Sequence, residues 1–345
     1  MIDFTNLKLS EFTTHKVGNK LRDEGLKISS EQISINIKTK ELLLKYFLSP
    51  FNELEVYNFT HSSELDLNAA YTFVSRIFKN NLEFHQNSIN LAKHLYENST
   101  HPKVNGGELS VCLLKNCLLD GIEVDGVGLF KSEVKDIFLK FEPTKDAFKI
   151  QYEKGVNIKK LDKGCLIFNL EEEQGYKVYI IDSNKSKDTQ YWKDDFLNIS
   201  PAADSFHFTK NFLSVTKDFV TKELVNDTSL SNPDRINILN KSVDYFKQHD
   251  SFEKEAFEKE VLKDQNIIDS FRVFNEVYNE HQGVQISDNF EISKQAVKKQ
   301  SKAFRNVLKL DKNFDIYIHG DRDLIEKGTD QNGRKYYKIY FEEEY

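Results

Sequence analysis

The sequence predicts an α+β protein: an antiparallel β-meander with packed helices, followed by a mainly helical region that ends in a basic helix and a β-hairpin. Two observations support this fold class. Short apolar runs rich in β-branched and aromatic residues follow one another from 109 to 182, and helical spacing of apolar residues dominates from 208 to 283. A chain of 345 residues is also long for a single core. We therefore expect two domains, residues 1–205 and 206–345.

Five short apolar runs of the first region follow one another and are separated by Gly, Pro or charged turns. In one of them, Phe138 and Lys140 alternate with Leu139 and Phe141, which is the period of a strand. Connections this short favour antiparallel pairing. The predicted meander consists of 109–119, 127–132, 137–142, 148–154 and 164–182, the last folding back at Gln174-Gly175.

Helices are expected before and after the meander in the chain. Residues 37–48 have helical spacing and stop before Pro50, as expected where a proline disfavours the α conformation of its predecessor. Ser231 precedes Pro233 and is a candidate helix cap. The predicted helices are 37–48, 67–80, 84–98, 208–225, 233–249, 252–263 and 266–283, and the polar stretch 183–207, with the only Trp, is interpreted as a surface connection.

Composition limits the function classes. The net charge of −7 argues against coating nucleic acid with the whole surface, but it leaves room for a local basic stripe. The three cysteines (Cys112, Cys117 and Cys165) lie in apolar runs without CxxC spacing, so we expect core residues in a reducing compartment. No run of 18 apolar residues occurs, and the N-terminus lacks the pattern of a signal peptide. These features predict a cytoplasmic protein without membrane contact.

One acidic cluster raises the question of catalysis. Asp120, Glu123 and Asp125 lie within six residues and could hold a divalent cation, but Asp-Gly at 120–121 is also typical of a tight hairpin turn, which we favour. Asp125 followed by Glu133 and Lys135 loosely matches the pattern of metal-dependent nucleases, a match common by chance in a highly charged chain. We expect no catalytic residue, metal or cofactor, and no enzyme.

The strongest binding signal lies near the C-terminus. Residues 292–313 hold seven basic residues and one acid, and five of the basic residues follow spacings of 4, 4, 3 and 4. One helix would align them on a single face suited to phosphate contact, although an ordinary amphipathic helix with a basic outer face is equally compatible. A hairpin of 314–320 with 334–341 would add cations and aromatic groups. The candidate DNA-binding residues are Lys294, Lys298, Lys299, Lys302, Arg305, Lys309, Lys312, Arg334, Lys335 and Lys338.

Several stretches in a fixed order resemble a known family: HPKVNGGELSV, DGVGLFKSE, FLKF, GVNIKKLDKGCLIFN, GYKVYIIDSNKSKDTQYWKDDFLNI and KLDKNFDIYIHGDRDLIEKG. Together they resemble the bacterial 37-kDa nucleoid-associated protein family, in the form found in Bacteroidetes-like bacteria. The resemblance implies a cytoplasmic protein of the nucleoid that associates with DNA or with DNA-bound machinery such as a type II topoisomerase. It offers no catalytic residues.

Three hypotheses follow for function. The first is sequence-tolerant DNA binding through Lys and Arg contacts to phosphate, with a structural or regulatory role on the chromosome. The second is a protein-interaction module that reaches the nucleoid through a partner such as a type II topoisomerase. The third is a metal-dependent nuclease using Asp120, Glu123 and Asp125. A homodimer would double the basic surface, but the sequence identifies no self-complementary face.

Overall fold

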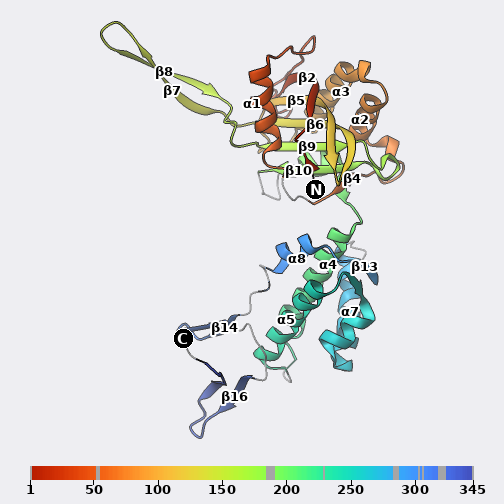
Figure 1. The fold of residues 1–345 in the computed structure, drawn as a ribbon, viewed down its shortest axis with the longest axis vertical. Coiled ribbons are helices and arrows are strands. Elements are labelled where there is room, and N and C mark those ends of the chain that lie inside the picture. Colours follow the sequence, from red (N-terminus) through yellow and green to blue (C-terminus); the bar gives the residue numbers. More distant parts are fainter. Residues whose placement is uncertain are drawn as a thin grey trace. The chain divides into compact units, whose positions relative to one another are not determined.

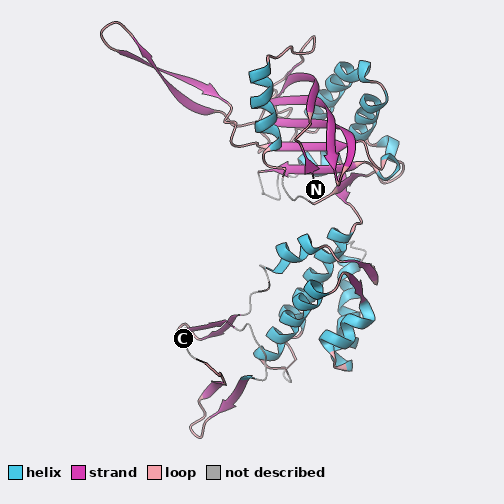
Figure 2. Ribbon diagram, in the orientation of Figure 1, coloured by secondary structure: helices cyan, strands magenta, loops and turns pink. Residues whose placement is uncertain are grey.

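The computed structural model describes residues 2–51, 55–183, 191–227, 230–282, 287–301, 304, 307–317 and 324–343. The chain forms two compact units, Met1–Ala202 and Ala203–Tyr345 (Figure 1). Whether each unit folds alone as a domain stays a prediction. Strands dominate the first unit and helices the second, which confirms the α+β fold class (Figure 2).

The first unit is built on an antiparallel sheet that has nine strands in the described residues. Four neighbours follow chain order and confirm the core of the predicted meander: β5 (Gly107–Leu119), β6 (Ile122–Ser132), β9 (Lys163–Phe168) and β10 (Lys177–Asp182). On the β5 side lie β1 (Ile2–Asp3), β2 (Lys8–Val17) and β3 (Leu26–Lys27), and on the β10 side lie β4 (Tyr57–Phe59) and β11 (Ile199–Pro201).

Two strands of the predicted meander are not part of this sheet. β7 (Asp136–Pro143) and β8 (Phe148–Gly155) pair with each other in a separate hairpin, which extends away from the sheet in Figure 1. The reason is that β6 pairs directly with β9, from Gly126↔Phe168 to Lys131↔Lys163. The prediction of one continuous meander was therefore wrong for 137–142 and 148–154.

Helices cover both faces of the sheet (Figure 2). α1 (Ile37–Leu48) places Phe47 on Phe130 of β6, with ring centroids 4.2 Å apart. The neighbouring strand residue, Leu129, belongs instead to the apolar core under α2 (Ala69–Lys79) and α3 (Phe84–Glu97). Because successive residues of a strand point to opposite faces, the sheet has a separate apolar core on each face.

The cysteines and the single tryptophan are core residues. Cys112, Cys117 and Cys165 are fully buried, as predicted, and burial raises the pKa of each thiol. Trp192 is also fully buried, and it packs on Phe196 one turn later in a π-helical turn. The interpretation of this stretch as a surface connection was therefore wrong for 191–201, while 184–190 lies outside the described residues.

The second unit contains α4 (Ser205–Asp218), α5 (Asn232–Gln248), α6 (Lys254–Phe257), α7 (Gln265–Gln282) and α8 (Lys294–Ser301), with the short pair β12 (Ser251–Glu253) and β13 (Asn289–Glu291). Phe212 of α4 occupies the centre of its core and contacts four other phenylalanine rings. Ser231 caps α5 and exchanges hydrogen bonds with Asp234, which confirms the predicted helix start. Among the helices in the described residues, none is long and apolar enough to cross a membrane.

Two hairpins complete the second unit: β14 (Val307–Leu310) with β15 (Phe314–Tyr317), and β16 (Ile325–Thr329) with β17 (Lys335–Ile339). The expected helix over 292–313 was wrong, because α8 ends at Ser301. The expected pairing of 314–320 with 334–341 was also wrong. Each strand pairs instead with its near neighbour in sequence, across a turn of three to five residues, the usual length for a hairpin loop.

Candidate nucleic-acid interface

Helix α5 supports the elements that carry the predicted cations. At its C-terminal end, the amine of Lys294 in α8 donates to the carbonyls of Lys247, 3.1 Å away, and His249. Near its N-terminal end, Ile236 packs with Ile325 of β16 and with apolar residues of β14, β15 and β17. Ile236 and Lys247 are eleven residue steps apart on this helix, a rise of about 17 Å. In Figure 1, α8 lies beside one end of α5 and the hairpins beside the other.

Three predicted cations lie on α8. The helix is anchored by Ala296 and Val297, both buried, and its lysines 294, 298 and 299 are exposed. Lys294 is also paired with Asp250 at 3.1 Å, and the amine of Lys299 lies 5.2 Å from the ring centroid of Phe206. Lys298 has no salt-bridge partner among the described residues, so its charge is available to a ligand.

Strand β17 combines cations with aromatic rings. Tyr336 and Lys338 alternate with Lys335 and Tyr337, so the two pairs point to opposite faces of the hairpin. Tyr337 packs toward Ile325 and Ile236, which leaves the face of Tyr336 and Lys338 to solvent.

One of these cations has an acidic neighbour. The amine of Lys338 lies 4.8 Å from the ring centroid of Tyr340, and it is 3.7 Å from Glu326. The contacts with Tyr340 and Glu326 raise the pKa of Lys338, so it stays charged at neutral pH.

The structure does not place the candidate residues in one row on a single helix face. Lys309 lies in β14, where only its backbone is described, and Lys312 lies in the turn between β14 and β15. Lys302 and Arg305 lie outside the described residues. The helix prediction used the spacing of charges, whereas the alternating apolar residues of β14 and β15 and the turn at Asp311 (φ 53°) determine the local structure.

The described cations that remain available are spread over three elements. Lys298 on α8, Lys312 in the turn between β14 and β15, Arg334 in the turn before β17 and Lys335 at the start of β17 are exposed. None of these four has a salt bridge in the described part of the chain. Each of these elements is supported by α5. The arrangement offers separate cations on elements that contact one helix, which suits a polyanion.

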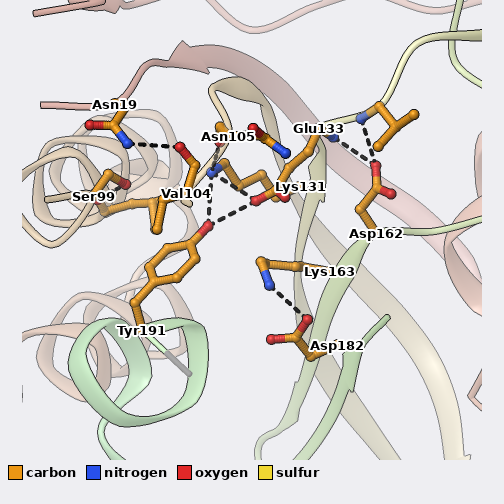
Figure 3. A network of polar contacts seen from close by, with 12 residues as sticks. Asn19, Ser99, Val104, Asn105, Lys131, Glu133, Asp162, Lys163, Asp182 and Tyr191 are labelled. Atoms are coloured by element: carbon orange, nitrogen blue, oxygen red, sulfur yellow. Dashed lines mark hydrogen bonds and ion pairs between the residues drawn. The ribbon is translucent and has the colours of Figure 1, made fainter. Parts of the chain in front are cut away.

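A polar network in the first unit was missed at the sequence level. Figure 3 shows the buried amine of Lys131 donating to the carbonyl of Asn105 (2.7 Å), the carboxylate of Glu133 (3.0 Å) and the hydroxyl of Tyr191 (2.8 Å). Burial lowers the pKa of Lys131, and Glu133 partly opposes this shift. The neighbouring Lys163 is also buried and donates to Asp182 at 2.7 Å. The local signal in the sequence was a lysine next to an apolar run: Lys131 follows one run and Lys163 precedes the next.

This network joins segments that are distant in sequence and serves the fold. Tyr191 donates to Glu133 at 2.9 Å, and the backbone amides of Glu133 and Val134 donate to Asp162 at 2.7 and 3.0 Å (Figure 3). The amine of Lys131 donates all three of its N–H groups to Asn105, Glu133 and Tyr191. Glu133, which the nuclease hypothesis would use, is therefore part of a structural network.

The acidic cluster at 120–125 forms a turn. Asp120 and Gly121 have φ values of 52° and 83°, and they connect β5 to β6 as the two central residues of a hairpin, as the turn interpretation predicted. Asp125 is paired with Lys115 at 2.5 Å. In the part of the chain that the structure describes, no group of three or more His, Cys, Asp or Glu side chains could hold a metal ion.

The chain is thus an α+β protein with an antiparallel sheet in its first unit and, in its second, exposed cations on several elements that suit a polyanion such as DNA. The family model described as nucleoid-associated protein YejK (NA37) matches residues 14–337, and the chain belongs to this family. A search among curated proteins finds no match. Family membership makes the chain a bacterial, DNA-binding protein of the nucleoid, located in the cytoplasm, and the family is generally not enzymatic.

Proposed function

We propose that the chain binds DNA directly and with little sequence preference, through Lys and Arg contacts to phosphate from the elements along α5. The observation that carries the proposal is the set of exposed cations without a salt-bridge partner in the described residues: Lys298, Lys312, Arg334 and Lys335. They lie in a chain of net charge −7, so the cationic surface is local. Binding of this kind gives the protein a structural or regulatory role on the chromosome.

The neighbouring aromatic residues support contact with a nucleic-acid strand. Tyr336 in β17 and Tyr340, directly after its end, are each about half exposed and flank Lys338. Aromatic faces next to cations provide stacking surfaces that tolerate any base sequence. Lys294 and Lys338 already have acidic partners, so we expect about four to six of the other candidate cations to contact phosphate. This number predicts a slope of log affinity against log salt of roughly −4 to −5.

The experiment measures the affinity of the pure protein for two unrelated duplexes and one single strand as a function of salt. Lys298→Glu with Lys335→Glu is expected to weaken binding to both duplexes equally and to reduce the slope by about 2, because two phosphate contacts are lost. The matched control is Lys38→Glu with Lys93→Glu, which makes the same charge change at exposed lysines of α1 and α3. An unchanged slope in the first double variant would exclude these lysines from the interface.

The alternative is that the same cations bind an acidic protein surface, such as one on a type II topoisomerase, and that the partner contacts DNA. Asp250 and Glu326 support it to a limited extent, because they show that carboxylates already fit beside Lys294 and Lys338. Negligible DNA affinity of the pure protein at low salt, together with co-purification of a topoisomerase lost in the Lys298 and Lys335 variant, would favour this alternative. A homodimer would present two such surfaces to either ligand.

A further inference from the structure

The hairpin of β7 and β8 forms an arm that has no partner strand in the described residues; we call residues 136–155 the β-arm. Its tip is closed by the amide of Thr144, which donates to the carbonyl of Ala147 at 2.8 Å. Its base is held by Asn157, whose amide donates to Asp136 at 2.8 Å. An isolated two-stranded hairpin is only marginally stable in water, so an ordered arm needs a further layer.

One face of the β-arm is apolar except at its base, where Lys154 lies opposite Ile137. Residues directly opposite each other on paired strands share a face, and two such pairs, Leu139↔Tyr152 and Phe141↔Ile150, occupy its centre. The six large side chains of this face are 58% to 69% exposed: Ile137, Leu139, Phe141, Phe148, Ile150 and Tyr152. The apolar side of the arm therefore faces solvent in the single chain.

The opposite face is polar apart from Phe138, which is 46% exposed, and its charges are matched within the arm. Lys140 pairs with Glu142 at 2.7 Å and lies 3.9 Å from Glu153. Across residues 136–155 four basic residues balance four acids, so the arm has no net charge: Lys140, Lys145, Lys149 and Lys154 against Asp136, Glu142, Asp146 and Glu153. It lacks the cationic excess that phosphate contact requires.

The exposed area is that of an interface. At about 200 Å² for a fully exposed large side chain, the six exposed fractions correspond to roughly 750 Å² per chain. This exceeds the ~300–600 Å² of the largest apolar patch on a typical monomer and approaches the ~800 Å² that each partner buries in a standard interface.

We propose that the β-arm is a dimerisation element whose apolar face packs on the same face of a second copy of this chain, about a two-fold axis. Two identical faces that are apolar except for Lys154 at the base are self-complementary, and face-to-face packing about 10 Å apart gives each hairpin the second layer that it lacks. Because the arm is electrically neutral, copies neither repel each other nor attract DNA. The inference is independent of DNA binding by the second unit.

The test measures the mass of the full-length protein by sedimentation equilibrium. The wild type is expected at twice 40.3 kDa. Leu139→Glu with Ile150→Glu should raise the dimer dissociation constant by roughly 100-fold or more, since four carboxylates would be buried without partners. The control, Lys149→Gln with Gln151→Glu, makes the same change in net charge on the polar face of the arm and should leave the dimer intact.

Cross-linking provides a second measurement that does not depend on the stability of the charge variant. The native cysteines are fully buried, so a cysteine introduced at Leu139 is the reactive thiol. A bis-maleimide spanning about 10 Å should join two copies through Leu139→Cys but not through Lys140→Cys on the opposite face. A monomeric wild type, a dimer that survives Leu139→Glu with Ile150→Glu, or equal cross-linking at both positions would overturn the proposal. The proposal would also be overturned if the wild type were monomeric and Leu139→Glu with Ile150→Glu abolished its DNA affinity, because the arm would then contact DNA.

Discussion

Replacing Lys131 by methionine removes the charge at the centre of the buried network and keeps most of the side-chain volume. The amine donates three hydrogen bonds of 2.7 to 3.0 Å, and its side chain is 0% exposed. Without it, the carboxylate of Glu133, 8% exposed, loses its cationic partner inside the protein. Removing one member of a buried ion pair costs about 3–5 kcal/mol, so we expect the first unit to lose that much free energy of unfolding.

Trp192 makes the assay specific for the first unit. It is the only tryptophan and is fully buried in the core of that unit, so its fluorescence during urea unfolding reports on this unit. Lys135→Met is the matched control, because Lys135 forms a partly exposed pair with Glu108 that should contribute less than about 1 kcal/mol. A loss below about 1 kcal/mol in Lys131→Met would refute the reasoning, since the amine would then contribute no more than a surface pair.

A double-mutant cycle separates the ion pair from the loss of packing. Glu133→Gln in the Lys131→Met background removes the buried charge that the first change leaves behind. The double variant should therefore be less destabilised than the sum of the single variants, by about 1–3 kcal/mol. Additive losses would show that the amine and the carboxylate act independently.

Two further predictions concern other buried polar groups. Burial lowers the pKa of His15 to about 4, against 6.5 for the free side chain, so only the unfolded chain binds a proton between these values. Stability of the first unit should fall by about 1–3 kcal/mol as pH drops from about 6.5 to 4, and His15→Gln should reduce this fall; an equal fall in both proteins would contradict the assignment. In the second unit, buried Glu258 accepts from Arg272 at 2.6 and 2.9 Å. Arg272→Met leaves the buried carboxylate of Glu258 without its cationic partner and should lower the unfolding midpoint measured by circular dichroism; an unchanged midpoint would contradict this.

Local patterns predicted those elements whose own residues determine them. The helix at Ile37–Leu48 has the predicted bounds, because Asn36 caps its first turn and Pro50 follows its end. The four central strands of the sheet, β5, β6, β9 and β10, were equally predictable from their apolar runs. The alternation of residues determines which face a side chain is on, but it does not determine which strand pairs with which. The sequence therefore could not show that β6 pairs with β9 and leaves the β-arm outside the sheet.

The candidate site was less predictable because charges do not determine local structure. Spacings of 4, 4, 3 and 4 among cations suggested one long helix, but a surface charge contributes little to helix stability, and the chain forms β14 after α8 ends at Ser301. The network around Lys131 was not predictable at all. Its members extend from Asn105 to Tyr191 and meet only after the sheet has formed.

The β-arm and the basic elements lie in different units, and this separation determines how the two proposals combine. A dimer joined through the arms would present two sets of cations to one DNA molecule, so the second contact becomes intramolecular and overall affinity rises by about 10²–10⁴-fold without any new contact to phosphate. Charge reversal at Lys298 and Lys335 removes phosphate contacts from each chain and changes the salt slope of either form. Breaking the dimer at Leu139 and Ile150 should leave the salt slope per chain unchanged. It should remove only the extra affinity that comes from joining two copies. The salt slope per chain therefore reports on phosphate contact, and the excess affinity of the wild type over the arm variant reports on dimerisation.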